Sequence, residues 1–88
     1  MSRSRELTVM SREWCHLCHD LLAQLVPLAA ELGWSLRVLD VDADPVLEER
    51  WNELVPVVLA GDDELCHYHL DEALIRAYCG RFPLESAG

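Results

Sequence analysis

Basic side chains are scarce in this 88-residue chain, which has 7 Lys and Arg residues against 16 Asp and Glu residues. The formal net charge at pH 7 is therefore −9. Nucleic acids and anionic membrane surfaces bind proteins through clustered Lys and Arg side chains. This shortage argues against both kinds of partner, and we expect no nucleic acid and no membrane.

Long hydrophobic runs are also missing. The longest apolar stretch is a handful of residues, far below the roughly 20 that span a bilayer. The basic segment 1–5 is followed only by the short run 7–10, whereas a secretory signal uses roughly 7–15 apolar residues. We expect a cytoplasmic protein with a single domain over residues 1–88 and a core over about 6–80.

Glycine and proline are few, at 4 each, and 51% of the residues are hydrophobic, which fits neither a fibrous repeat nor a disordered chain. The 4 cysteines allow two interpretations. In a secreted miniprotein they would form a disulfide framework, with three pairings open. In a cytoplasmic chain with so apolar a core, metal or redox chemistry is the better use of cysteine.

The hydrophobic pattern predicts an alternation of strands and helices. The expected strands cover residues 6–10, 35–41, 55–60 and 64–68, and the expected helices cover 15–32, 45–52 and 71–79. Apolar residues at 17, 21, 25, 28 and 32 mark one face of the first helix, which Gly33 should end, and Gly80 should end the last. The order β-α-β-α-β-β-α predicts an α/β fold with a mixed four-stranded sheet and helices packed on it, its strand 35–41 buried.

A Cys-x-x-Cys motif, Cys15 to Cys18, lies where the first strand gives way to the first helix. This spacing in a βαβ context is typical of redox proteins. Two intervening residues on the first helical turn bring the sulfurs close enough to form a small disulfide ring. The unpaired N–H groups of that turn favour Cys15 as a thiolate, the form that attacks disulfides. We expect Cys15 to be the nucleophile and Cys18 to be the resolving cysteine.

These features resemble the small bacterial glutaredoxin-like family of the thioredoxin-fold superfamily. In that family the motif and its long helix are followed by a Val-Pro that opens a hairpin, and Val55-Pro56 stands at that place here. The resemblance covers residues 6–80. It implies a thioredoxin-like fold and thiol–disulfide oxidoreductase activity with glutathione as reductant or co-substrate. It also implies that Pro56 is cis and packs against the disulfide, that Val55 offers backbone groups to the substrate, and that Arg12 meets a glutathione carboxylate.

The chain departs from the glutaredoxin pattern in two places. His16-Leu17 stands between the cysteines where Pro-Tyr is usual. Segment 66–69 replaces the Gly-Gly turn and following acid that hold the γ-glutamyl end of glutathione, although Asp71 and Glu72 could reach that region. The oxidoreductase class is therefore better supported than glutathione as the specific partner. Protein or low-molecular-weight disulfides are the expected substrates.

Aromatic and histidine side chains near the motif are interpreted by position. Trp14, beside Cys15, is expected to belong to the substrate platform. Trp34 and Trp51 are expected to pack in the core or at a helix edge. His16 either stabilises the Cys15 thiolate and moves a proton to the leaving thiol, or is an exposed spacer.

Other functions stay open on the residues alone. Zinc would find four suitable ligands in Cys15, Cys18, Cys66 and either His67 or His69, and an iron–sulfur cluster would bridge two chains through Cys15. A non-catalytic interaction module would keep the fold without the chemistry. Because a binding module needs neither sulfur, we expect an oxidoreductase. We also expect it to be monomeric, with no metal and no bound cofactor. Cys66 and Cys79 are then small buried apolar side chains.

Overall fold

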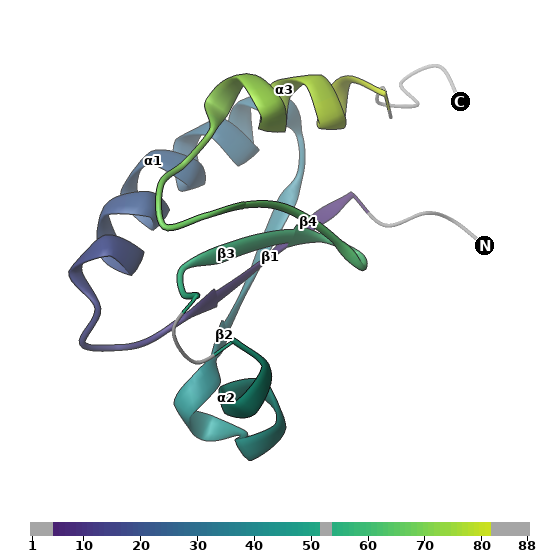
Figure 1. Ribbon diagram of the computed structural model, residues 1–88. Helices are drawn as coiled ribbons and strands as arrows, with labels where there is room; N and C mark the ends of the chain where they lie inside the picture. Colours follow the sequence, from purple (N-terminus) through teal and green to yellow (C-terminus); the bar gives the residue numbers. More distant parts are fainter. Residues whose placement is uncertain (1–4, 52–53, 82–88) are drawn as a thin grey trace.

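The computed structural model describes residues 5–51 and 54–81 (Figure 1). In chain order the elements are β1 (Glu6–Ser11), α1 (His16–Leu32), β2 (Ser35–Asp40), the 3-10 helix η1 (Val41–Ala43), α2 (Pro45–Trp51), β3 (Val57–Ala60), β4 (Asp63–His67) and α3 (Glu72–Gly80). This confirms the predicted order, to which the structure adds η1. Residue 52, where the second helix is predicted to end, lies outside the described residues.

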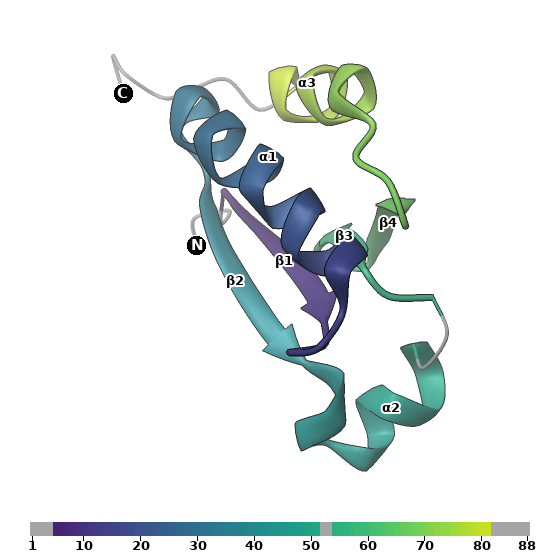
Figure 2. The ribbon, with the colours of Figure 1, turned by 90° about the vertical axis from the view of Figure 1, so that its left-hand side faces the viewer.

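The four strands form one mixed sheet in the order β2-β1-β3-β4. β1 pairs with β2 in parallel, with Glu6 opposite Ser35, and β3 runs antiparallel to both β1 and β4. The helices α1 and α3 lie over one face of this sheet, and α2 lies beyond the end of β2 (Figures 1 and 2). The predicted mixed four-stranded sheet is thus confirmed.

Alternate residues of the strands point to opposite faces of the sheet and form two cores. The helix-side cluster, under α1 and α3, consists of Leu7, Val9, Leu21, Leu25, Leu28, Trp34, Val58, Ala60, Ile75 and Cys79. The α2-side cluster consists of Met10, Cys18, Val41, Trp51, Val55, Val57 and Leu59. One cysteine of the motif is therefore part of a core, and both predicted core tryptophans are buried.

Short polar side chains and one glycine set the helix ends. Gly33 has φ 78°, the left-handed conformation that glycine adopts without strain, and it ends α1 as predicted. Asp44 caps α2, since its Oδ1 accepts a hydrogen bond from the Val46 N–H at 2.9 Å. Among the helices of the described residues, none is long and apolar enough to cross a membrane.

The prediction of a buried strand over residues 35–41 is wrong in two respects. β2 ends at Asp40, and it is an edge strand with most of its residues exposed. Val38, for example, is 49% exposed. Among the described strands β1 alone pairs with β2, so β2 has no strand on its other side, whereas β1 and β3 each lie between two strands. Val41 belongs instead to η1, where its side chain is buried.

The last helix also differs from its prediction. Gly80 is its final residue, and the chain leaves through Arg81 in the right-handed region, with the Arg81 N–H bonded to the Tyr78 carbonyl at 3.1 Å. A left-handed glycine is not needed for that tightened turn. Ile75 and Cys79, one helical turn apart, form the buried stripe of this short helix, whereas Leu74 is 40% exposed.

Candidate active site

Both cysteines of the motif lie at the start of α1, in the segment that follows β1. Cys15 is the N-cap residue, with extended backbone angles of φ −101° and ψ 114°. Its Sγ accepts a hydrogen bond from the Cys18 N–H at 3.2 Å. The Cys15 N–H bonds the Arg12 carbonyl at 3.3 Å, which closes the turn that leads into the helix. The first turn of the helix thus directs a backbone N–H at the Cys15 sulfur.

The two cysteines differ in their exposure to solvent. Cys15 is half-buried, whereas Cys18 is completely buried in the α2-side cluster. Burial, followed by a hydrogen bond with Cys15, raises the pKa of the Cys18 thiol to about 12, although a backbone hydrogen bond and the guanidinium charge of Arg12 act in the opposite direction. Cys18 therefore holds its proton near neutral pH, and Cys15 is the sulfur that a substrate can reach.

The raised pKa of Cys18 makes the stability of the reduced protein sensitive to alkali. In the unfolded protein Cys18 has the ordinary cysteine pKa of 9.0, whereas in the folded protein its pKa is about 12. The folded protein therefore holds this proton more tightly than the unfolded protein. This stabilising contribution is complete below about pH 9 and is lost as the pH rises from about 9 to about 12. We expect the free energy of unfolding, from urea titrations of the reduced protein, to fall over that range and to fall less in Cys18→Ala.

Two other thiols do not disturb this comparison. Burial also raises the pKa of Cys66 and of Cys79, but both residues are present in either protein. The difference between the two pH profiles therefore belongs to Cys18. Parallel profiles for the two proteins would contradict the burial argument.

The Val55-Pro56 peptide bond is cis, as the family resemblance implies. Val55 is 8% exposed and belongs to the α2-side cluster with Cys18, and Cys15 packs against the same cluster. The Pro56 carbonyl accepts a hydrogen bond from the Tyr68 N–H at 2.8 Å. The structure thus brings the cysteines and the Val-Pro segment together around one core, although their separation in the chain is about forty residues.

Arg12 makes contacts that sequence reasoning missed. Its Nε donates to Asp42 Oδ1 at 3.0 Å, and its Nη2 lies 4.0 Å from Glu48 Oε2. The Arg12 side chain is only 11% exposed, and its guanidinium lies 5.2 Å from the centre of the Trp14 ring. Arg12 therefore ties the segment before Cys15 to η1 and α2. Its role toward glutathione stays a prediction.

The remaining predicted site residues are placed as follows. Trp14 is 71% exposed and precedes Cys15 directly, and His16 is exposed on the first turn of α1. Asp71 caps α3, because its Oδ1 accepts the Leu74 N–H at 3.1 Å. The positions of Trp14 and His16 suit contacts with a substrate, and the substrate roles of all three residues stay predictions.

The four residues of the zinc alternative do not converge. Cys66 lies in β4 and packs against the helix-side cluster, whereas Cys18 belongs to the α2-side cluster. His67 Nδ1 is 2.9 Å from Glu64 Oε2, so this histidine is already engaged. Over residues 5–51 and 54–81, no three His, Cys, Asp or Glu side chains come together as a metal ion would require. The zinc set of Cys15, Cys18, Cys66 and His67 or His69 is therefore wrong.

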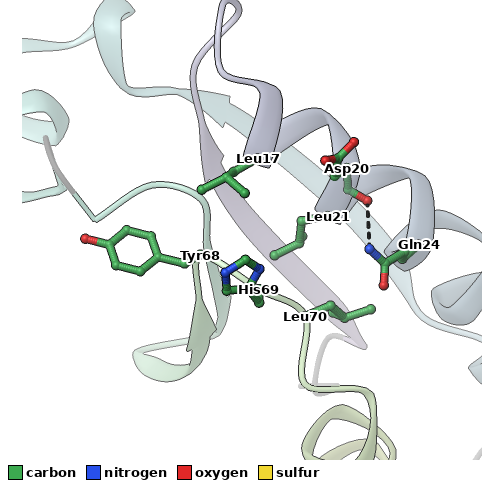
Figure 3. Close-up of a pocket in the computed structure, with 7 residues that line it drawn as sticks. All are labelled: Leu17, Asp20, Leu21, Gln24, Tyr68, His69 and Leu70. Carbon is green, nitrogen blue, oxygen red and sulfur yellow. Dashed lines mark hydrogen bonds between the residues drawn. The ribbon is translucent and has the colours of Figure 1, made fainter.

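A cavity beside the motif was not predicted. It has a volume of about 230 Å³ and is lined by Leu17, Asp20, Leu21, Gln24, Tyr68, His69 and Leu70 (Figure 3). The apolar spacing in α1 places Leu17 on the buried face, but Leu17 is 40% exposed and lines this cavity instead. Its position between the two cysteines was the signal that could have drawn attention to it.

Solved structures show the class of fold. The structure of thioredoxin 1 from Thermosipho africanus matches with a TM-score of 0.63 and 18% sequence identity, over 86% of this chain and 96% of that chain. Together with the four-stranded mixed sheet and its helices, this match shows a thioredoxin-like fold.

The family follows from closer matches. The model of the family described as Glutaredoxin-like domain (DUF836) matches residues 6–79, and the chain belongs to that family. Protein Ne2328 from Nitrosomonas europaea, solved by solution NMR, is 40% identical with a TM-score of 0.75, over 89% of this chain and 94% of that one. The uncharacterized protein Rv0508 of Mycobacterium tuberculosis is 31% identical over 86 residues, which is 92% of this chain and 88% of that protein. The resemblance predicted from the motifs is thus confirmed.

Proposed function

We propose that this protein is a glutaredoxin-like thiol–disulfide oxidoreductase that works through both cysteines of its motif. The observation that carries the proposal is the unequal environment of the two sulfurs. Cys15 is half-buried and its Sγ accepts the Cys18 N–H at 3.2 Å, whereas Cys18 is completely buried. This arrangement suits one sulfur to attack from solvent and the other to act only after the first has reacted.

The reaction follows from thiol–disulfide exchange. The Cys15 thiolate attacks one sulfur of the substrate disulfide, forms a mixed disulfide and releases the other substrate sulfur as a thiolate. Cys18 then loses its proton and attacks the Cys15 sulfur, which closes the Cys15–Cys18 disulfide and releases the second substrate thiolate. The substrate disulfide gains two electrons and two protons in total, and the protein dithiol is oxidised.

The proposed substrates are protein or low-molecular-weight disulfides. A thiol must reduce the Cys15–Cys18 disulfide again after each cycle, and we take glutathione as the reductant or co-substrate. The proposed reaction uses no resident cofactor. We further propose that the protein is a monomer and acts in the cytoplasm.

An equilibrium redox titration tests the proposal. The protein is equilibrated in glutathione buffers of graded potential, and its thiols are alkylated and counted by intact mass. We expect one reversible two-electron step in Cys15 and Cys18 at a potential between about −180 and −270 mV, the range of known exchange catalysts. A motif that stays reduced over the whole range would overturn the proposal.

A further inference from the structure

The cavity beside the motif combines apolar walls with one carboxylate. Leu17 and Leu21 of α1 face His69 and Leu70 across it (Figure 3). Asp20 supplies the negative charge, and none of the seven lining residues is Arg or Lys. An elongated side chain with an apolar stem and a cationic end has the matching chemistry.

The carboxylate of Asp20 is available to a ligand. Within the described residues it has no ion pair or hydrogen bond. The nearby Gln24 amide donates to the backbone carbonyl of Asp20 at 3.3 Å (Figure 3). Arg12, the basic residue closest to the motif in the chain, is by contrast held by Asp42 at 3.0 Å. The charges at the site therefore favour a cation in the cavity over an anionic ligand such as glutathione.

The cavity is also placed within reach of a substrate at Cys15. Leu17, one of its walls, stands between the two cysteines of the motif. On the opposite wall, the Tyr68 N–H donates to the Pro56 carbonyl at 2.8 Å, which joins the cavity to the Val-Pro segment. A polypeptide that presents a disulfide to Cys15 thus brings its neighbouring side chains to this opening.

We propose that this cavity binds a Lys or Arg side chain that lies close to the disulfide of a polypeptide substrate, an inference that rests on the proposed exchange at Cys15. The aliphatic stem of the side chain packs between Leu17, Leu21 and Leu70, and its charged end meets the Asp20 carboxylate. The net charge of −9 draws basic polypeptides toward the protein before contact.

Reduction kinetics with a matched set of peptides test this proposal. Each peptide carries one disulfide and a single varied residue, Lys, norleucine or Glu, placed at successive positions on either side of the cysteine. We expect the best Lys peptide to exceed its norleucine counterpart in kcat/KM by about two- to fivefold, the range that a partly exposed ion pair supports, and added salt to reduce that preference.

Two variants assign the preference to the cavity. Asp20→Asn should remove the preference for Lys, so that the Lys and norleucine peptides react at similar rates. Asp62→Asn makes the same change of charge in the turn between β3 and β4, at the opposite end of β4 from Tyr68, and should keep the preference. Equal rates for all peptides with the unmodified protein would overturn the proposed binding of a Lys or Arg side chain. Faster reduction of the Glu peptide, or of glutathione disulfide, than of the Lys peptide would overturn it as well. Neither result would contradict the exchange reaction at Cys15.

A binding measurement separates failure of the pocket from failure of the proposed function. The same Lys peptide with Ser in place of its cysteine is titrated into the isotope-labelled protein, and NMR shifts are followed at Leu17 and Leu70. If no peptide is reduced, the proposed function fails. Shifts at both leucines that Asp20→Asn abolishes would then still support the pocket, and the absence of shifts would overturn it as well.

Discussion

Cys15→Ser is expected to reduce disulfide exchange to the uncatalysed background. The serine hydroxyl keeps the position at the N-cap of α1, but at neutral pH it is not ionised and does not attack a disulfide. Cys18 cannot take over the attack, because it is completely buried and burial raises the pKa of its thiol to about 12. The measurement is the rate of reduction of a peptide disulfide with glutathione as reductant.

Cys18→Ser should give the opposite result, an accumulated mixed disulfide. The hydrogen bond that Cys15 Sγ accepts comes from the backbone N–H of residue 18, so the substitution keeps it. The first attack therefore proceeds at close to its normal rate, and no second sulfur is present to release the substrate. Intact mass spectrometry of the protein after mixing with the peptide would show one peptide attached through Cys15.

Cys66→Ser is the control for this pair. Cys66 lies in β4 and packs against the helix-side cluster, away from the α2-side cluster that holds Cys18. Exchange should be unchanged and no adduct should accumulate in this variant. Equal residual activity of Cys15→Ser and Cys18→Ser would show that the two cysteines do not have the roles assigned to them.

The order of the elements could be predicted because each depends mainly on its own residues. The helix that ends at Gly33 and the Asp44 cap before Pro45 are local signals, and the structure contains both. The exposure of Val38 could not be predicted in this way. Whether an apolar strand lies inside a sheet or at its edge depends on which strands pair with it, and this information is not contained in the strand's own pattern.

The same distinction holds within the site. Cys15 and Cys18 are neighbours because they share one helical turn, so their spacing was sufficient to predict them. The ion pair between Arg12 and Asp42 joins residues that are 30 positions apart in the chain. It forms because β1 and β2 are parallel, so that η1, which follows β2, begins beside the end of β1. The cavity likewise requires α1 to face the segment after β4, and no local pattern reports that approach.

Trp51→Ala is expected to lower the free energy of unfolding by about 3–5 kcal/mol, the usual effect of truncating a buried large aromatic. Trp51 is 7% exposed in the α2-side cluster, and the guanidinium of Arg50 lies 4.8 Å from the centre of its ring. Domains of this kind have a total stability of about 5–15 kcal/mol, so the loss is a large part of it. Urea titration followed by far-UV circular dichroism measures the effect without relying on tryptophan fluorescence.

Trp14→Ala is the matched control, since it removes the same side chain from a position that is 71% exposed. Its effect on stability should stay within about 0.5 kcal/mol, as for most surface substitutions, while exchange with peptide substrates should slow if Trp14 belongs to the substrate platform.

Trp51 shares its cluster with Cys18 and Val55, so the Trp51→Ala substitution should also expose Cys18 and bring the pKa of that thiol down toward its ordinary value. Alkylation of Cys18 as a function of pH measures this change. An unchanged profile in Trp51→Ala would mean that burial in the α2-side cluster does not raise the pKa of Cys18. The different roles proposed for Cys15 and Cys18 would then need another physical cause.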